Sequence, residues 1–452
     1  MISPKGSVCT TDGMGRRDGM NGTVSQDGAV RRRIAGFLSA LAVFLSPAIL
    51  PAGEGPVPSS FYVEEALSNN PSLSAMQERI RMKENAAIRA GALDDPKGWV
   101  GITNVPVKSW SFREEDMTGK EIGVSQMIPY SGKRKLRTDV VVREKEQTEF
   151  DLQEMRNMLR AEIQMTYAEI SYVRRQAEVV RRTREILREI VAVSQEMYAV
   201  GRVPQADVHR GQVEFEKMRE MLLVLENREK VLSIRLNTLA ALPPELPVPE
   251  IEHLHEFTVP FRMEELLAMY KEERPARKSL QARVLRGEAS IAMANKEYYP
   301  DFEISASYMQ RDATPDGTRR PDMFSSMVLW TLPIWRKEKL DPFVREMTAE
   351  REMARRELAN LDLEAANAIG KSLATIENRS SVAVLFRTTI IPHAETNFET
   401  ALAAYRVGKV DFPTLLDTIK NILSFRKDYH ETVGDLNVEK ARLGAVVGKD
   451  LN

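Results

Sequence analysis

The sequence predicts a mainly α-helical protein with a small β part, built from two halves that repeat one pattern. Prolines recur at a fixed distance along the chain. A stretch of 74 residues contains no proline and carries heptad rows of apolar residues. Short segments of alternating apolar and polar residues lie between the helical segments. We therefore expect each half to run helix, strand pair, long helix, turn and helix.

Composition excludes several classes of protein. The 452 residues include 64 Lys and Arg against 65 Asp and Glu, and a single Cys. One Cys excludes a disulfide framework and a Cys-based zinc site. The balanced charge argues against nucleic-acid binding through net charge. A mean hydropathy of −0.34 leaves no room for many apolar runs of ~20 residues, which a polytopic helical membrane protein requires.

Residues 1–52 are predicted to be a leader with a secretory signal peptide. Arginines at 31–33 precede an apolar run over 34–50, which ends in small residues. Pro47 interrupts this short run, which disfavours a retained membrane anchor. Cys9 lies upstream of the run and would be removed with it, so we expect no lipid anchor on the mature chain.

The prolines define an internal repeat. Three pairs lie 204 residues apart: Pro71 and Pro275, Pro96 and Pro300, Pro129 and Pro333. Length alone would suggest about three domains of ~150 residues, but the repeat predicts two halves instead. We place the first repeat at 53–242, a Pro-rich linker at 243–260 and the second repeat at 261–452.

The spacing of apolar residues along the chain predicts the helices. We expect a long helix at about 135–200, followed by one at about 205–241, and in the second half helices at about 343–407 and 412–447. Along the first long helix, ten of fourteen positions in two heptad rows are apolar, which is typical of coiled-coil packing. At ~1.5 Å per residue this rod is on the order of 100 Å long.

Each long helix is expected to end in a tight hairpin turn. Gly201 and Gly408 stand where a helix end favours a left-handed residue. Pro204 is predicted to lie in the first turn of the next helix. In the second half, Asp411 is predicted to cap the following helix, with Pro413 in its first turn.

The strand pairs are expected at about 99–107 with 120–128, and at about 302–310 with 324–334. In the third strand, apolar residues at 302, 304, 306 and 308 alternate with polar residues. Alternating strands of ~9–11 residues with aromatic ends are typical of a membrane β-barrel. A small sheet with one buried face is the alternative, but the predicted signal and the long rod favour the membrane.

Four strands cannot close a barrel, and an open sheet edge is not tolerated in lipid. Several copies must therefore contribute strands. Three subunits would give twelve strands, an even number within the known range. The sequence thus predicts a homotrimer with a 12-stranded transmembrane β-barrel.

Several segments, in this order, resemble one family. They are EALSNNP at 65–71, VSQMIPYSGK at 124–133, Tyr198-x-x-Gly201 with Asp207, LNTL at 236–239, and Tyr405-x-x-Gly408 with Leu415-Leu416-Asp417. Over roughly 61–447 the chain resembles the TolC-type outer membrane efflux proteins, or outer membrane factors. The segment at 125–133 is similar to the heavy-metal efflux (CusC/CzcC-like) branch.

This resemblance implies a trimeric duct in the outer membrane, with a long periplasmic α-helical barrel continuing its β-barrel. The duct would passively export substrate delivered by an inner-membrane RND-type pump or other transporter and a periplasmic adaptor (membrane fusion) protein. It implies neither enzymatic activity nor a cofactor. Heavy-metal cations are one candidate substrate, and efflux of drugs or organic compounds, or type I secretion, are alternatives. A structural coiled-coil envelope protein is a further alternative.

The resemblance also implies gating residues at the helix tips. Asp207 and Asp417 correspond to places where relatives carry constricting acids, and Thr414 stands where relatives often have a further acid. Arg202, Tyr198 and Tyr405 are the candidate latches. The alternative for Asp207 is a first-turn acid favoured by the helix dipole.

The same tips are candidates for adaptor docking, through Gly201, Arg202, Gly408 and Lys409; simple helix termination is the alternative for the glycines. A basic run at 133–137 would face anionic head groups or form a solvated helix start. We expect no metal site, because only five His are present and the 21 Met are interpreted as packing residues.

Overall fold

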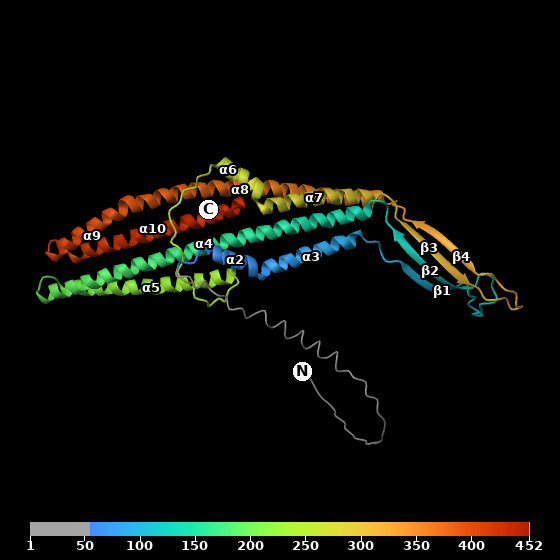
Figure 1. The fold of residues 1–452 in the computed structure, drawn as a ribbon, viewed down its shortest axis with the longest axis horizontal. Coiled ribbons are helices and arrows are strands. Elements are labelled where there is room, and N and C mark those ends of the chain that lie inside the picture. The colour runs from blue at the N-terminus through green and yellow to red at the C-terminus, as the bar shows by residue number, and fades with distance from the viewer. Residues whose placement is uncertain (1–54, 452) are drawn as a thin grey trace, which may run out of the picture. The chain divides into compact units, whose positions relative to one another are not determined.

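The computed structural model describes residues 55–451. The predicted leader and signal peptide, together with Cys9, lie outside the described residues. Helices account for most of the described chain and a four-stranded antiparallel sheet for the rest of its regular structure (Figure 1). This confirms the predicted fold class of a mainly α protein with a small β part.

The elements recur in the same order in the two halves. The first half comprises α2 (Ser59–Asn69), α3 (Pro71–Gly91), β1 (Lys97–Thr103), β2 (Gly119–Ile128), α4 (Lys133–Ala199) and α5 (Gln205–Leu239). The second comprises α6 (Met263–Glu273), α7 (Pro275–Lys296), β3 (Phe302–Gln310), β4 (Met323–Trp330), the π-helical η1 (Arg336–Leu340), α8 (Asp341–Leu385), the π-helical η2 (Phe386–Ile390), α9 (Ile391–Arg406) and α10 (Phe412–Val447).

Equivalent helices have nearly equal lengths. Helices α2 and α6 have 11 residues each, and α5 and α10 have 35 and 36. Pro71 and Pro275 both open a helix at its first position, where the missing N–H has no intrahelical partner to lose. The fixed proline spacing therefore reflects equivalent helix starts.

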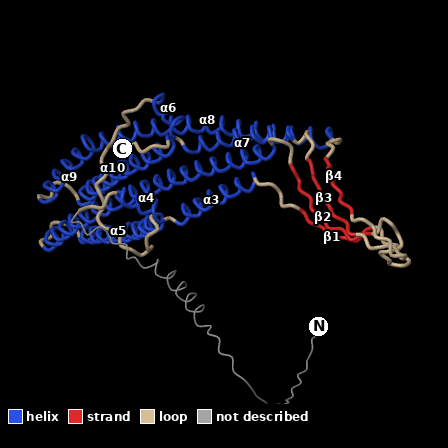
Figure 2. The backbone as a smooth tube through the Cα atoms, turned by 45° about the vertical axis from the view of Figure 1, so that its right-hand side comes forward, coloured by secondary structure: helices blue, strands red, loops and turns tan. Residues whose placement is uncertain are grey.

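The strands form one sheet in the order β1-β2-β3-β4 (Figure 2). Strands β2 and β3 come from different halves and pair from Ile128 opposite Phe302 to Lys120 opposite Gln310, over all of β3 and all of β2 except Gly119. The sheet therefore joins the two halves. Strands β1 and β4 each have one edge without a partner among the described residues.

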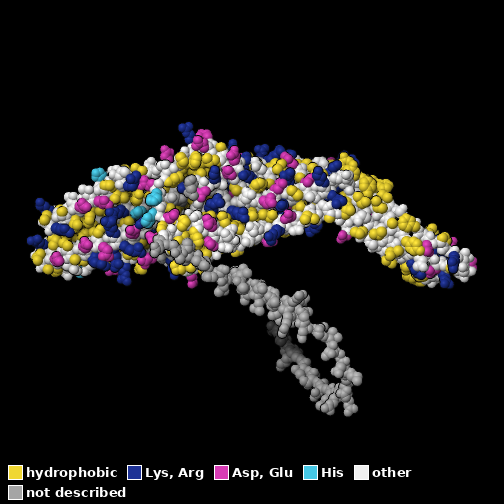
Figure 3. Space-filling model, in the orientation of Figure 1, with side chains coloured by type: hydrophobic (Ala, Val, Ile, Leu, Met, Phe, Trp, Pro, Cys, Tyr) yellow, Lys and Arg dark blue, Asp and Glu magenta, His cyan; other side chains and the backbone are white. Residues whose placement is uncertain are grey.

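One face of this sheet is apolar and exposed. Its exposed side chains include Val100, Ile122, Val124, Ile304, Tyr308, Phe324, Val328 and Trp330. On the surface drawn in Figure 3, hydrophobic side chains gather over the strands, whereas charged side chains are spread over the helices. The opposite face carries Ser125, Ser305 and Ser307 with Glu121 and Glu303.

Several element ends differ from the predictions. The first strand ends at Thr103 rather than 107, because Asn104 has a left-handed φ of 53° and Pro106, which follows, has no N–H to donate. The fourth strand ends at Trp330 rather than 334, ahead of Pro333. The helix predicted at 343–407 contains the π-helical η2, which closes two residues before Pro392. A proline cannot supply the helical hydrogen bond at its own position, so the helix winding changes there.

Helix α4 lies at the centre of the helical part and packs against α3, α5, α7 and α10. Its heptad residues Val173, Val180 and Leu187 are buried. A side chain at Gly434 of α10 would collide with the ring of Tyr172 in α4, so these two helices approach closely. No helix among residues 55–451 is both long and apolar enough to cross a membrane.

The Pro-rich segment predicted as a linker is bound to the helices over which it passes (Figure 1). The Tyr167 hydroxyl of α4 donates to the Val57 carbonyl at 2.8 Å and accepts from the Glu252 N–H at 2.7 Å. Arg174 donates to the carbonyl oxygens of Val248 and Pro249, at 2.8 and 2.6 Å. The segment is therefore fixed to the bundle.

The Tyr167 contact predicts a stability loss. Burial raises the pKa of this phenol to about 12. A folded-state pKa above the ordinary value of 10 means that this contribution to stability is complete below pH ~10 and is lost as pH rises towards 12. Tyr167→Phe should lower the free energy of unfolding in urea by about 1–3 kcal/mol, because both hydrogen bonds of this buried hydroxyl are lost. An unchanged unfolding midpoint would contradict this role.

Candidate functional site

The two hairpin tips lie at the end of the helices opposite the sheet (Figure 1). Gly201 follows α4 with φ +73°, and Gly408 follows α9 with φ +76°. The Arg202 N–H donates to the Met197 carbonyl at 2.8 Å, and the Lys409 N–H to the Ala404 carbonyl at 2.9 Å. Each is the six-to-one bond of a Schellman turn, so both tips use the same helix ending.

The helices after the two turns begin differently. Asp411 caps α10, because its carboxylate accepts from the Thr414 N–H at 3.3 Å, and Pro413 lies in the first turn. Hydrogen bonds from the Thr414 side chain and N–H hold the pKa of Asp411 below its usual value. Pro204, in contrast, has an extended ψ of 151° and precedes α5, which begins at Gln205. The prediction that Pro204 lies inside the first turn was therefore wrong by one residue.

Tyr405 lies inside the helical bundle and connects the two hairpins. It is 1% exposed, and its hydroxyl lies 2.9 Å from the Ser194 Oγ of α4. Ser194 donates to the Ile190 carbonyl, so Tyr405 is the donor of the pair. Its ring packs edge-on against Phe412, with the centroids 5.9 Å apart. Burial raises the pKa of the Tyr405 phenol, and the charge of Asp207 acts in the same direction.

The equivalent residue in the first half, Tyr198, is 46% exposed. The two tyrosines proposed as latches therefore stand in different environments, although their sequence motifs match.

The two predicted acids also differ. The Asp207 side chain is only 11% exposed and lies 3.6 Å from Arg210. Asp417 is exposed on α10, and no hydrogen bond or ion pair of its side chain occurs among residues 55–451. Thr414, also exposed, lies one turn before Asp417 on the same helix. Asp207 follows its tip glycine by six residues and Asp417 by nine, so Thr414, not Asp417, is the repeat equivalent of Asp207.

The docking candidates are all at the surface. Gly201, Arg202, Gly408 and Lys409 are exposed, and a β-carbon at either glycine would meet nothing within 4 Å. Within one protomer, neither Arg202 nor Tyr198 hydrogen-bonds Asp207 or Asp417 in the described part of the chain.

Sequence reasoning missed a polar contact between the hairpins. Glu214 of α5 is buried and accepts from Lys217 at 2.8 Å and from Lys420 of α10 at 3.1 Å. Burial alone would raise the pKa of Glu214, but these two ammonium groups hold it below its usual value. Nearby, a β-carbon at Gly211 would lie 2.8 Å from Val191 and 3.1 Å from Phe412, so this mid-helix glycine makes room for the Phe412 ring. Gly211, a glycine in the middle of a helix, was the sequence feature that could have indicated this close approach.

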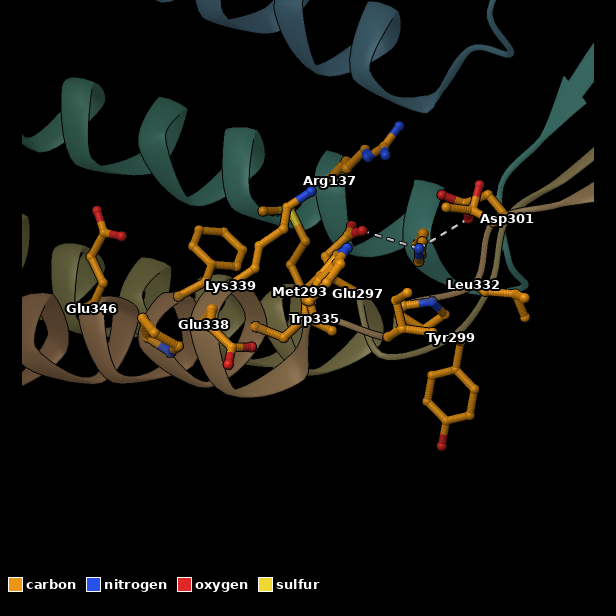
Figure 4. Close-up of a pocket in the computed structure, with 17 residues that line it drawn as sticks. Arg137, Met293, Glu297, Tyr299, Asp301, Leu332, Trp335, Glu338, Lys339 and Glu346 are labelled. Carbon is orange, nitrogen blue, oxygen red and sulfur yellow. Dashed lines mark hydrogen bonds and ion pairs between the residues drawn. The ribbon is translucent and has the colours of Figure 1, made fainter.

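A second buried charge lies where the sheet meets the helices. The Lys133 ammonium at the start of α4 lies 3.0 Å from Asp301 and 3.1 Å from Glu297 (Figure 4). Asp301 also accepts from the Tyr130 N–H at 2.8 Å. These contacts fix β2, α4 and the start of β3 to one another beside a cavity of about 800 Å³. Lys133 is 1% exposed, so for this residue the expectation of a solvated or head-group-facing basic run was wrong.

No group of three or more His, Cys, Asp or Glu side chains between residues 55 and 451 is arranged to hold a metal ion. His253 contacts Arg175, and neither His253 nor His255 belongs to such a group in this part of the chain.

Comparison with known proteins gives one family match. Residues 62–242 match the outer membrane efflux protein family, a stretch that coincides with the first half. None of the curated proteins matches the chain.

Several solved structures share the fold. The outer-membrane channel OprN is 16% identical with a TM-score of 0.74, covering 87% of this chain and 90% of its own. The outer membrane protein VceC from Vibrio cholerae is 17% identical with a TM-score of 0.73, covering 87% of this chain and 97% of its own. CusC, described as a transmembrane channel, is 12% identical with a TM-score of 0.70, covering 86% of this chain and 92% of its own. At these identities the likeness establishes the fold.

The different environments of the two tip tyrosines predict different effects of one substitution. Tyr405→Phe should lower the free energy of unfolding by about 0.5–1.5 kcal/mol, because Ser194 loses its buried partner. Tyr198→Phe is the matched control and should change it by less than about 0.5 kcal/mol, as expected for an exposed position. Urea unfolding followed by circular dichroism measures both. Equal effects would contradict the assignment of Tyr405 to the interior.

Proposed function

We propose that this chain is one subunit of a homotrimeric outer membrane channel through which substrate leaves the periplasm passively. One observation carries the proposal: a sheet with an exposed apolar face continues directly into helices of up to 67 residues. The match of residues 62–242 to outer membrane efflux proteins supports it. The chain is then a transport duct and not an enzyme.

The sheet supports the trimer. Strands β1 and β4 each leave one edge unpaired among the described residues, and every backbone donor and acceptor in lipid needs a partner. If β4 of one subunit pairs with β1 of the next, three subunits close a barrel of twelve strands. The apolar face then meets lipid and the polar face lines the pore.

Aromatic residues support the same orientation. Trp330 and Phe302 lie at one end of the apolar face, and Tyr308 and Phe324 at the other. Aromatic girdles at both membrane interfaces are typical of outer membrane barrels. The long helices would then stand in the periplasm and form the continuing α-helical barrel.

The partners follow from this placement. A passive duct needs an energy source elsewhere, so an inner-membrane RND-type pump and a periplasmic adaptor complete the system. The exposed tips at Gly201–Arg202 and Gly408–Lys409 are the surfaces farthest from the sheet, and we assign adaptor docking to them. Binding of an adaptor there would also be the natural trigger for opening the tips.

Asp417 is the better candidate for the gate. Its carboxylate is exposed and carries no partner within the described part of one protomer, so three copies around the axis would form a negative ring. Asp207 is largely buried beside Arg210 and Tyr405, which favours a structural role. Thr414, one turn before Asp417, adds no charge to the ring. Arg202 and Tyr198 are the candidate latches at the surface, whereas Tyr405 would act from the interior through its bond to Ser194.

The candidate substrates fall into three chemical classes. The segment at 125–133 favours heavy-metal cations. Drugs or other organic compounds, and proteins of type I secretion, are alternatives, and metal and drug sensitivities of a deletion strain would separate them. A purely structural coiled-coil role leaves the exposed apolar face of the sheet without a purpose.

The gate is tested by single-channel recording in planar bilayers. Asp417→Ala should weaken block by a trivalent cation at least tenfold, because the ring of three carboxylates is removed. Asp207→Asn should leave the block unchanged, because that side chain faces the bundle. Unchanged block in Asp417→Ala would eliminate the ring.

Docking at the tips is tested by photo-crosslinking in cells. A crosslinking residue at Arg202 or Lys409 should capture a periplasmic adaptor identified by mass spectrometry. The same residue at the exposed Glu220, in the middle of α5, is the control and should not. Absence of capture at both tips, or equal capture at Glu220, would refute tip docking.

A further inference from the structure

The polar face of the sheet carries four methionines. In the strand register, Met127 lies opposite Glu303, Met309 opposite Met323, and Met327 opposite Ser305. All four therefore share the face that carries Ser125, Ser305 and Ser307. The apolar face contains no methionine in any of the four strands.

Trp99 and Leu329 also lie on the polar face, 37% and 43% exposed, but the methionines of the four strands lie on it without exception. An apolar side chain chosen only for hydrophobicity belongs on the apolar face, where neighbouring positions are Val, Ile, Phe and Trp. Instead, Met323 and Met327 stand 38% and 57% exposed among serines. Their thioethers are therefore accessible to solutes at the polar face of the sheet.

Each half of this methionine set has a carboxylate beside it. Glu121, Met309 and Met323 form one row across β2, β3 and β4. Met309 folds over β2, because a β-carbon at Gly119 would lie 2.7 Å from its sulfur, and Gly119 leaves that space open. Glu303 lies directly opposite Met127 and diagonal to Met327, and it accepts from the Ser125 hydroxyl at 2.6 Å.

This combination of side chains favours soft monovalent metal ions. Thioethers are soft ligands that favour Cu(I) over the hard cations, which prefer oxygen; Ag(I) is the soft monovalent analogue. A carboxylate beside them raises the local concentration of cations. Each set supplies two thioethers and one carboxylate. Glu121, Met309 and Met323 lie in one row, whereas Met327 lies in the row next to that of Met127 and Glu303. Such a ligand set gives a binding position from which an ion can exchange, as conduction requires.

We propose that the polar face of the sheet holds two thioether–carboxylate sites for soft monovalent metal ions, Cu(I) or Ag(I). One site consists of Glu121, Met309 and Met323, and the other of Glu303, Met127 and Met327. Their position along a pore wall rests on the proposed channel function, whereas the binding itself does not. For these four residues the proposal replaces the interpretation of methionine as packing alone.

The sites are tested by calorimetric titration of the purified full chain with Ag(I). Cys9→Ser removes the only thiol, and a nitrate buffer with excess K⁺ avoids silver chloride and tests selectivity. We expect two Ag(I) ions per protomer. Met309→Leu/Met323→Leu should lose one of them and Met127→Leu/Met327→Leu the other, each with at least a tenfold fall in affinity at the altered site.

The control is Met82→Leu/Met353→Leu, which changes two exposed methionines on α3 and α8 and should leave both ions bound. Leu and Met have similar volume, so the strand variants should fold, and circular dichroism checks this. Equal Ag(I) binding by the wild type and the fourfold Leu variant, or no binding by either, would overturn the proposal.

A bilayer experiment separates this inference from the channel function. Micromolar Ag(I) should reduce K⁺ conductance of the wild type and leave that of the fourfold Leu variant unchanged. Ag(I) binding without any K⁺ conductance would support the sites and refute the channel. Conductance that Ag(I) reduces equally in both proteins would refute the sites and leave the channel standing.

Discussion

Within residues 55–451, the backbone groups along the outer edges of β1 and β4 have no partner strand, and this constrains the rest of the structure. A four-stranded sheet with an exposed apolar face is unstable in water, and with two open edges it is equally unsuited to lipid. In the proposed channel, other copies of the same sheet close these edges. Once those copies are arranged around an axis, the helices that leave the sheet are arranged around it as well.

The contacts at the end of the sheet next to the helices explain how the two halves of the chain stay aligned. Lys133 opens α4 and is held by Glu297 and Asp301 from the second half, and β2 pairs with β3 across the halves. The long α4 then carries this alignment without a break to the tip. There Tyr405 with Ser194, and Glu214 with Lys420, connect the first hairpin to the second. A change in the spacing of the two hairpin tips would have to break these polar contacts.

Much of this architecture was predictable from the sequence because it depends on local chemistry. Proline positions predicted the repeat, since Pro71 and Pro275 both need the first position of a helix. Gly201, Gly408 and Asp411 predicted the turns because left-handed backbone and helix capping depend on the residue itself.

Features that depend on partners distant in the sequence were not predictable. Tyr198 and Tyr405 share a motif, yet only Tyr405 has Ser194 and Phe412 beside it. Lys133 looked like part of a solvated basic run until Glu297 and Asp301 were placed next to it. The methionines looked scattered because their common face follows from the strand register and from no pattern along the chain.

The proposed function depends most on three copies of this chain closing one barrel in the outer membrane. Membrane fractionation followed by electrophoresis, with and without boiling, tests it most directly. A closed trimeric barrel should give an outer-membrane species that migrates unboiled as a trimer and dissociates to single subunits on boiling. A monomer recovered in the soluble periplasmic fraction would contradict it.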